Sequence, residues 1–229
     1  LGIPLDHNIN ILENRVELYV TDLSDFSDAL QQANIQLPDN IEVIEVDGLS
    51  REIADIYAGL ALSSCTSGFS VKNGSGTKGI TTAGHCSNSL SYNGKNLPYQ
   101  SGIWQFQYDV QWHTAPDFTV RNLAWDGTWN RYIYGEKHRN NQYVGEYVCK
   151  YGKSTGGGCG NITSTTFNGT YIRVHSDSAD LGEPGDSGGP WFLGNTAYGL
   201  FTGDIEPGND AYYMAINYID ILGLDVLTN

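Results

Sequence analysis

The amino-terminal part of the chain combines two alternating segments with one segment of helical spacing. Residues 15–21 (RVELYVT) and 41–46 (IEVIEV) alternate apolar and polar side chains, which predicts two half-buried strands. Between them, Ser24 or Asp25 caps a predicted helix over residues 25–36, where apolar side chains recur at helical spacing. The pattern therefore predicts a small β-α-β unit at the start of the chain.

From about Ile53 onward, the pattern changes to short strand-like runs separated by Gly, Asn and Ser. Many short strands at close, even spacing, with turn residues between them, are typical of an antiparallel barrel or sandwich. We therefore expect an N-terminal unit over residues 1–50 and an all-β domain over residues 51–229. The clearest runs are residues 66–71, 79–82, 143–149, 171–174 and 197–201.

Charge and composition narrow the classes of function. The chain has 26 acidic and 12 basic residues, a formal charge of −14, which argues against nucleic acid or an anionic membrane as the main partner. Hydrophobic residues make up 40%, enough for a packed core and unlike a disordered acidic tail. No apolar run approaches the roughly 18 residues that span a bilayer. The chain does not open with a basic segment followed by an apolar one, so we expect that any signal peptide has been removed.

The four cysteines are even in number and contain no CxxC pair, so we expect two disulfides in a secreted protein and no metal site. Three pairings are open at this point. Possible glycosylation triplets begin at Asn73, Asn161 and Asn168, but a chain this rich in Asn, Ser and Thr has a few by chance. The cysteines are Cys65, Cys86, Cys149 and Cys159.

The segment Gly185-Asp186-Ser187-Gly188-Gly189-Pro190 is the strongest local signal for chemistry. Flanking glycines let the backbone approach a substrate carbonyl, and the N–H groups of Gly185 and Ser187 could converge on a developing oxyanion. A glycine-rich turn is the plain alternative. The segment also matches the nucleophile elbow of α/β-hydrolases, but there the histidine follows the serine, and all five histidines here precede Ser187. The subtilisin-like order of acid, histidine and serine stays open by position, although the all-β pattern argues against it.

His85 is the candidate base for this serine. It lies in residues 82–86 (TAGHC) directly after a predicted strand, where a disulfide at Cys86 would hold the imidazole. His113, beside a tryptophan, is more simply a strand residue, and His138, between two basic residues, suits a solvated loop.

An acid that orients the imidazole is expected between His85 and Ser187 in the chain. Asp109 lies in residues 108–112 (YDVQW), where a carboxylate can be buried if it is hydrogen-bonded. Asp117, in a proline-adjacent context, is the second choice.

Residues 82–86 and 185–190, in this order, resemble the chymotrypsin-like serine peptidases, and more closely the bacterial branch of α-lytic protease and the streptogrisins. Residues 65–71 (CTSGFSV), 148–156 (VCKYGKSTG) and 183–184 support the likeness, which covers the chain from about residue 53 to its end. The resemblance implies two antiparallel six-stranded β-barrels, roughly residues 53–125 and 140–229, with the cleft between them. It also implies a secreted, monomeric serine endopeptidase that acts on protein or peptide substrates without a cofactor.

The resemblance assigns roles to individual residues. Ser187 is the nucleophile, His85 the general base and Asp109 the orienting acid, with Gly185 and Ser187 forming the oxyanion hole. The implied disulfides are Cys65–Cys86 and Cys149–Cys159. Thr202 aligns with a position whose side chain hydrogen-bonds the buried acid, and Asp186 is expected to form an ion pair with Lys150.

The substrate pocket is less well specified. Phe201, Gly203 and Asp204 align with the strand that edges the pocket in this family. Asp204 stands where relatives commonly have glycine, so its carboxylate either attracts a basic substrate residue or faces solvent. Phe201 stands where glutamate-specific relatives use histidine, which disfavours acidic specificity. A disulfide usual in the bacterial relatives is missing, because Leu181 and residues 205–209 provide no cysteine.

Residues 1–50 resemble, more weakly, the end of the pro-region that chaperones folding in these peptidases, and a mature N-terminus would fall near residues 51–53. Our hypothesis is an accessory unit that is retained and packed on the protease domain; a cleaved or inhibitory segment is the alternative. For the whole chain, the alternatives to an endopeptidase are a catalytically silent binding protein of the same fold and an esterase with the same triad.

Overall fold

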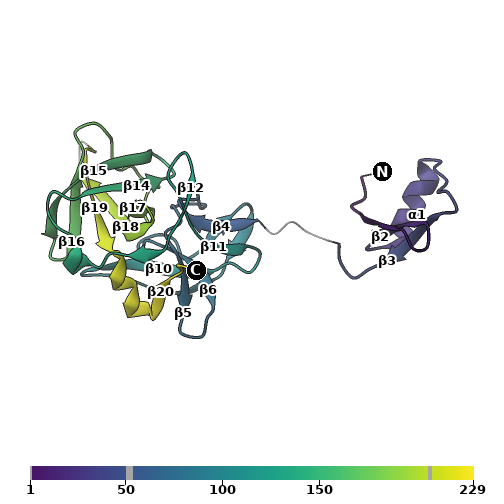
Figure 1. Ribbon diagram of the computed structural model, residues 1–229, viewed down its shortest axis with the longest axis horizontal. Coiled ribbons are helices and arrows are strands. Elements are labelled where there is room, and N and C mark those ends of the chain that lie inside the picture. Colours follow the sequence, from purple (N-terminus) through teal and green to yellow (C-terminus); the bar gives the residue numbers. More distant parts are fainter. Residues whose placement is uncertain (1, 50–53, 206–207) are drawn as a thin grey trace. The chain divides into compact units, whose positions relative to one another are not determined.

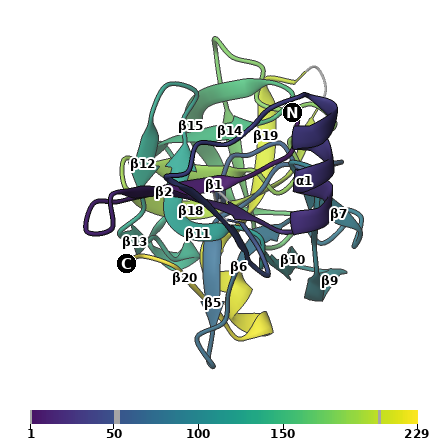
Figure 2. The same cartoon turned by 90° about the vertical axis from the view of Figure 1, so that its right-hand side faces the viewer.

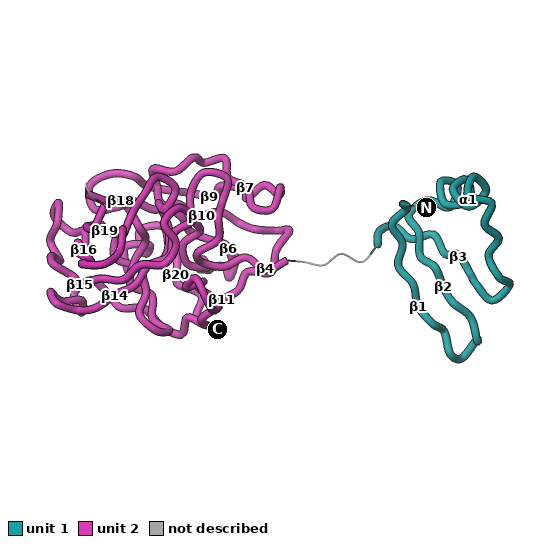
Figure 3. The backbone as a smooth tube through the Cα atoms, turned by 90° about the horizontal axis from the view of Figure 1, so that it is seen from above, with its two compact units in different colours: residues 1–52 teal, residues 53–229 magenta. Residues whose placement is uncertain are grey.

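The structure is a computed structural model that describes residues 2–49, 54–205 and 208–229. It divides into two compact units, Leu1–Glu52 and Ile53–Asn229 (Figure 3). The expected mature N-terminus at residues 51–53 lies outside the described residues. No helix in the described parts of the chain is long and apolar enough to cross a membrane.

The first unit is a three-stranded sheet with one helix, in the order β1 (Asp6–Asn10), β2 (Arg15–Val20), α1 (Leu23–Gln32) and β3 (Ile41–Glu45) (Figure 1). Strands β2 and β3 run parallel and are joined through α1, while β1 pairs antiparallel with β2. The expected β-α-β unit therefore carries an additional strand, β1, that the sequence pattern did not predict.

The helix starts earlier and ends earlier than expected. Asp22 is its N-cap, and its side chain accepts hydrogen bonds from the backbone N–H groups of Ser24 at 2.9 Å and Asp25 at 3.0 Å. Ser24 and Asp25 therefore lie inside the first turn and donate to the cap, which corrects the prediction that one of them is the cap. Phe26 is the buried residue of α1 and packs this unit's apolar face.

The second unit is built from short strands joined by turns and by the 3₁₀ helices η1 (Arg139–Asn141) and η2 (Ile216–Leu222). Its all-β class agrees with the sequence prediction. The strands are β4 (Asp55–Ala58), β5 (Ser70–Asn73), β6 (Lys78–Thr82), β7 (Leu90–Tyr92), β8 (Lys95–Leu97), β9 (Tyr99–Gln105), β10 (Tyr108–Thr114), β11 (Thr119–Trp125), β12 (Asn130–Tyr132), β13 (Gly135–Glu136), β14 (Tyr147–Gly152), β15 (Gly156–Phe167), β16 (Tyr171–His175), β17 (Pro190–Leu193), β18 (Thr196–Ile205), β19 (Asp210–Ala215) and β20 (Leu224–Val226).

The later strands of the second unit close into a barrel. They follow the order β18-β17-β14-β15-β16-β19, and the pairing of β18 with β19 completes the ring. Large aromatic side chains fill its interior: Trp191 stacks on Tyr213 at 5.0 Å and on Phe201 at 6.4 Å between ring centroids. The barrel thus provides a rigid support for the loops at its rim.

The earlier strands form a five-stranded sheet, β20-β5-β6-β10-β9, and a three-stranded sheet, β12-β11-β4. The strand nearest the C-terminus, β20, pairs with β5, so the end of the chain lies on the five-stranded sheet of the second unit (Figure 2). Conversely, β13 pairs with β18 of the barrel. After η2 the chain thus leaves the barrel and ends on the five-stranded sheet.

Candidate active site

His85, Asp109 and Ser187 come together from three separate segments. His85 lies in the loop after β6, Asp109 is the second residue of β10, and Ser187 lies in the loop before β17. His85 Nε2 is 2.8 Å from Ser187 Oγ, and His85 Nδ1 is 3.1 Å from Asp109 Oδ1 and 3.0 Å from Oδ2. The three side chains therefore form one continuous hydrogen-bonded row.

The Asp109 carboxylate controls the state of His85. It is fully buried, whereas the His85 side chain is 25% exposed. The backbone N–H of His85 also donates to Asp109 Oδ1, at 3.0 Å. The hydrogen bond to Asp109 raises the pKa of His85 above its ordinary value, although burial lowers it. A carboxylate at Nδ1 keeps the proton there, which leaves Nε2 free to accept the proton of Ser187.

The loop that carries Ser187 depends on glycine. Gly185 and Gly188 have φ values of +111° and +82°, which side-chain-bearing residues rarely adopt. A Cβ at Gly188 would lie 2.1 Å from Thr82 Oγ1. The carbonyl of Gly185 accepts a hydrogen bond from Thr66 Oγ1 at 2.8 Å. Within the described part of the chain, no hydrogen bond engages the backbone N–H of Gly185 or of Ser187.

Asp186 and Lys150 form the expected ion pair, so that prediction is confirmed. Lys150 Nζ lies 3.0 Å from Asp186 Oδ2, and both side chains are buried. Asp186 also accepts hydrogen bonds from Ser154 N at 2.8 Å and from Thr155 Oγ1 at 2.5 Å. Burial alone would raise the pKa of Asp186, but the hydrogen bond from Thr155 and the charge of Lys150 hold it below its ordinary value. This cluster fixes the residue directly before the serine.

The two disulfides follow the pairing that the resemblance implied. Cys65 and Cys86 are joined with an S–S distance of 2.01 Å, directly beside His85. Cys149 and Cys159 are joined at 2.03 Å and lie opposite each other on β14 and β15. Both predictions are confirmed.

No family model matches the chain, but its sequence is similar to that of several curated serine proteases. Streptogrisin-C of Streptomyces griseus is 32% identical over 200 residues, which are 78% of this chain and 42% of that protein. Serine protease 2 of Streptomyces fradiae is 31% identical over 150 residues, 61% of this chain and 86% of that protein. The chain belongs to the chymotrypsin-like bacterial serine peptidases. Members of this family are serine endopeptidases, which are hydrolases.

Solved structures support the two-barrel peptidase fold. Nocardiopsis protease and Thermobifida fusca protease A each match with a TM-score of 0.66 and 26% identity. The matches cover 76% and 77% of this chain and the whole of each of those chains.

The residues expected to edge the substrate pocket of this peptidase occupy different environments. Phe201 is 2% exposed and its ring packs in the barrel core. Gly203 lies under the Tyr212 hydroxyl, which would be 2.7 Å from a Cβ at that position. Asp204 is partly exposed and borders Gly182, where an added Cβ would lie 2.6 Å from the Asp204 Cβ. Sequence reasoning missed Tyr212 and Gly182, because only the folded barrel brings them to this strand.

Thr202 does not have the hydrogen bond expected from the peptidase family. Its Oγ1 is buried and has no hydrogen-bond partner among the described residues. The pairing of β18 with β19 shifts register between Phe201 and Gly203, which places Thr202 at the irregularity. The expected bond from Thr202 to Asp109 is therefore corrected: the partners that hold the carboxylate are the backbone and ring N–H groups of His85.

An exposed tryptophan beside the His85–Asp109–Ser187 row was also missed. The rings of His85 and Trp104 lie 5.7 Å apart with an interplanar angle of 54°, and Trp104 is 69% exposed. Trp104 lies on β9, which pairs with β10, so Trp104 is opposite Asp109 in the sheet. The sequence offered one sign of this neighbourhood, since Trp104 lies only five residues before Asp109.

Other candidates lie away from the row. His113 is buried in β10, and His138 is an exposed residue paired with Glu136 at 3.0 Å. Asp117 lies beyond the end of β10, so Asp109 is the acid that meets His85. No group of three or more metal-binding side chains occurs among the described residues.

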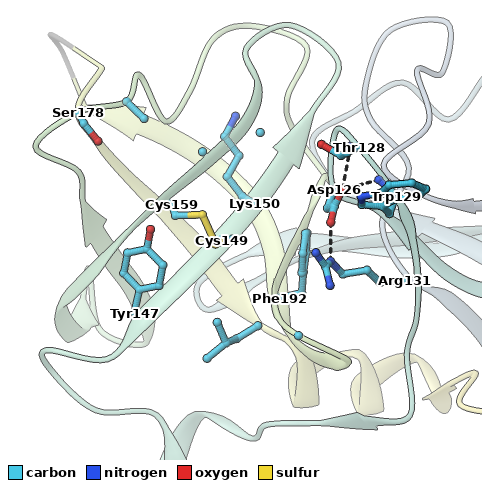
Figure 4. Close-up of a pocket in the computed structure, with 15 residues that line it drawn as sticks. Asp126, Thr128, Trp129, Arg131, Tyr147, Cys149, Lys150, Cys159, Ser178 and Phe192 are labelled. Carbon is cyan, nitrogen blue, oxygen red and sulfur yellow. Dashed lines mark hydrogen bonds and ion pairs between the residues drawn. A yellow bond between two sulfur atoms is a disulfide. The ribbon is translucent and has the colours of Figure 1, made fainter.

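A cavity of about 760 Å³ lies apart from the catalytic row, beside the Cys149–Cys159 disulfide (Figure 4). None of His85, Asp109 and Ser187 lines it. The charged Asp126 at its edge already has partners: it accepts hydrogen bonds from the backbone N–H groups of Thr128 and Trp129 and pairs with Arg131 at 2.5 Å.

Proposed function

We propose that the second unit hydrolyses peptide bonds in protein or peptide substrates through His85, Asp109 and Ser187. The 2.8 Å contact between His85 Nε2 and Ser187 Oγ is the observation that carries the proposal, because it joins a base to a nucleophile. Asp109 is buried and holds the other ring nitrogen, as an orienting acid must.

The reaction divides into two halves. His85 Nε2 takes the proton of Ser187 while Oγ attacks the substrate carbonyl, and the negative charge that develops on the carbonyl oxygen is stabilised by the N–H groups of Gly185 and Ser187. Collapse of this intermediate breaks the C–N bond, and His85 returns the proton to the leaving amine. Water then attacks the acyl-enzyme with His85 again as base, which releases the acid and restores Ser187.

The unengaged N–H groups of Gly185 and Ser187 support the oxyanion role. A hydrogen bond from Thr66 to the Gly185 carbonyl, with the ion-paired Asp186 between the two amides, limits how this loop can move. Preorganised donors of this kind are worth about 10²–10³ in kcat.

Secretion, a monomeric state and independence from cofactors are parts of the same proposal. Two disulfides support an extracellular location, because disulfides persist in oxidising compartments. We propose further that residues 1–50 form a retained accessory unit, supported by the compact folding of Leu1–Glu52 by itself. An N-terminus near residue 53 in the active secreted enzyme would contradict retention.

Covalent labelling tests the peptidase proposal. The intact chain treated with a fluorophosphonate should gain one adduct, located by mass spectrometry on the peptide that contains Ser187. Ser187→Ala is the matched control and should gain none. A folded wild-type chain without an adduct would favour the silent binding protein. Hydrolysis of esters but of no peptide in a library would favour the esterase, and the same library reports whether Asp204 selects a basic residue.

A further inference from the structure

Strand β10 presents a row of three buried polar side chains, of which the proposed reaction uses one. Asp109, Gln111 and His113 alternate along the strand and are all fully buried. Alternate residues of a strand face the same side, and the contact between Gln111 and His113 shows that their side chains share it. Burying an amide and an imidazole is costly unless both are hydrogen-bonded.

The Gln111 amide spans the loop that carries His85. Its Nε2 donates to the carbonyl of Ala83 at 2.8 Å and to the carbonyl of Cys86 at 2.9 Å. These carbonyls lie on either side of His85, so both amide protons hold the ends of one tight turn. Gly84 leaves this turn little freedom to move, because a Cβ there would lie 2.3 Å from the carbonyl oxygen of Ile103.

His113 fixes the orientation of that amide. The two carbonyls require the NH₂ group, so the Gln111 Oε1 must face His113 Nε2, which lies 3.0 Å away and therefore has to donate. The other ring nitrogen, Nδ1, lies 2.8 Å from the carbonyl oxygen of Leu97, which is also an acceptor. A neutral ring with its proton on Nε2 donates to Gln111 Oε1, and only a doubly protonated ring would also donate to the Leu97 carbonyl.

The surroundings of His113 oppose the charged ring. Burial lowers its pKa, although the hydrogen bond to Leu97 raises it. On the β9 side, the Tyr99 ring lies edge-on at 5.6 Å, and β6 contributes Ile80 opposite His113. These neighbours supply no charge, so the hydrogen bonds alone hold the ring and the Gln111 amide in place.

We propose that Gln111 and His113 are positioning residues for His85, which set the path of residues 83–86 and so align the imidazole between Asp109 and Ser187. The inference rests on the proposed function. Neither residue contacts the reacting atoms. A shift of about 1 Å in a catalytic group can cost about 10²-fold in rate, so a small displacement of this loop is enough to matter.

Variants that remove or keep particular hydrogen-bond donors of Gln111 and His113 test this positioning role. Gln111→Met keeps the length and loses both donors; we expect kcat to fall about 10- to 100-fold with little change in KM. His113→Gln places an amide near Nε2 and should keep most of the activity. His113→Asn places its amide near Nδ1, so it can bond Leu97 but not Gln111, and should lose activity like Gln111→Met. Ser70→Ala is the control, since Ser70 lies in the same sheet and the variant removes its partly buried hydrogen bond of 2.7 Å to the Arg121 carbonyl.

A second readout does not need activity. In a Ser187→Ala background, NMR titration of labelled histidine gives the pKa of His85, which should fall in Gln111→Met and stay unchanged in Ser70→Ala. Equal kcat values for His113→Gln and His113→Asn, or an unchanged His85 pKa in Gln111→Met, would overturn the inference. Absence of the fluorophosphonate adduct in wild type would instead overturn the proposed function, and the titration would still report on the loop.

Discussion

Replacing Lys150 with methionine is expected to weaken the second unit strongly. The substitution keeps a long unbranched side chain but leaves the Asp186 carboxylate buried without its cation; the two side chains are 1% and 0% exposed. Removing one partner of a buried ion pair costs about 3–5 kcal/mol. Asp186 keeps three hydrogen bonds, from Ser154 N, Thr155 N and Thr155 Oγ1, so we expect the lower end, about 3 kcal/mol.

Tryptophan fluorescence during urea unfolding measures this loss. All five tryptophans lie in the second unit, so with the disulfides intact the signal reports that unit alone. A loss of about 3 kcal/mol also lowers Tm by about 6–12 °C in a domain of this size. The control, Arg121→Met, breaks a half-exposed pair with Asp55 at 3.2 Å and should cost less than about 1 kcal/mol. If Lys150→Met costs no more than this control, the buried pair does not contribute as reasoned.

Activity and stability should respond to pH in opposite directions around His85. Asp109 raises the pKa of His85, so kcat/KM should decline with unit slope as pH falls through a value above 6.5. The stabilisation from the contact with Asp109 is complete below the ordinary pKa of histidine and is lost as pH rises through the raised pKa of His85. An acid limb below pH 6.5 in the pH profile of kcat/KM would contradict this. Gly188→Ala should lower the free energy of unfolding by more than about 2 kcal/mol, because φ is +82° and the new Cβ would meet Thr82 Oγ1 at 2.1 Å. Gly194→Ala is the control, because Gly194 also has a positive φ of +57° but has open space around it, so the difference between the two variants in the urea titration measures the clash alone. Equal losses of unfolding free energy in both variants would contradict a contribution from the clash.

The hydrogen-bonded row of His85, Asp109 and Ser187 could be proposed from sequence because its members lie in distinctive local segments. His85 is next to a cysteine and follows a strand, and Ser187 is enclosed by glycines. Their order in the chain is enough to exclude the α/β-hydrolase fold, in which the histidine follows the serine. The Lys150–Asp186 pair was available only through the resemblance, since nothing local links two residues that are 36 positions apart.

Features that depend on contacts between distant residues were missed. Strand β1 (DHNIN) has no alternating pattern, because polar groups hold it: Asn8 and Asn10 donate to Glu17 on β2 at 3.0 and 2.9 Å. Those hydrogen bonds, with one from Tyr19 as the largest contribution, lower the pKa of Glu17 to about 2. A partly enclosed carboxylate that stays ionised thus replaces the apolar contact that strand prediction relies on.

Gln111 and His113 illustrate the same limit within the active-site region. In the sequence they are two polar residues of a short strand, and the partners of Gln111, the carbonyls around His85, lie 25 and 28 positions earlier. Hydrogen bonds to backbone carbonyls leave no mark in the residue types of the acceptors. Reactive side chains can therefore be inferred from residue type more easily than the side chains that hold the backbone around them.

Thr66 explains how one site can be built from two halves of the second unit. Its N–H donates to the Ser187 carbonyl at 3.0 Å and its Oγ1 donates to the Gly185 carbonyl at 2.8 Å, both on the serine loop. Its own carbonyl accepts from Thr82 Oγ1 at 2.8 Å, at the start of the loop that carries His85. The neighbouring Cys65 is bonded to Cys86 at the end of that loop. Residues 65–66 thus connect the His85 loop and the Ser187 loop to one short segment, so the 2.8 Å contact between His85 and Ser187 depends on these bonds and not on the packing of the two halves alone.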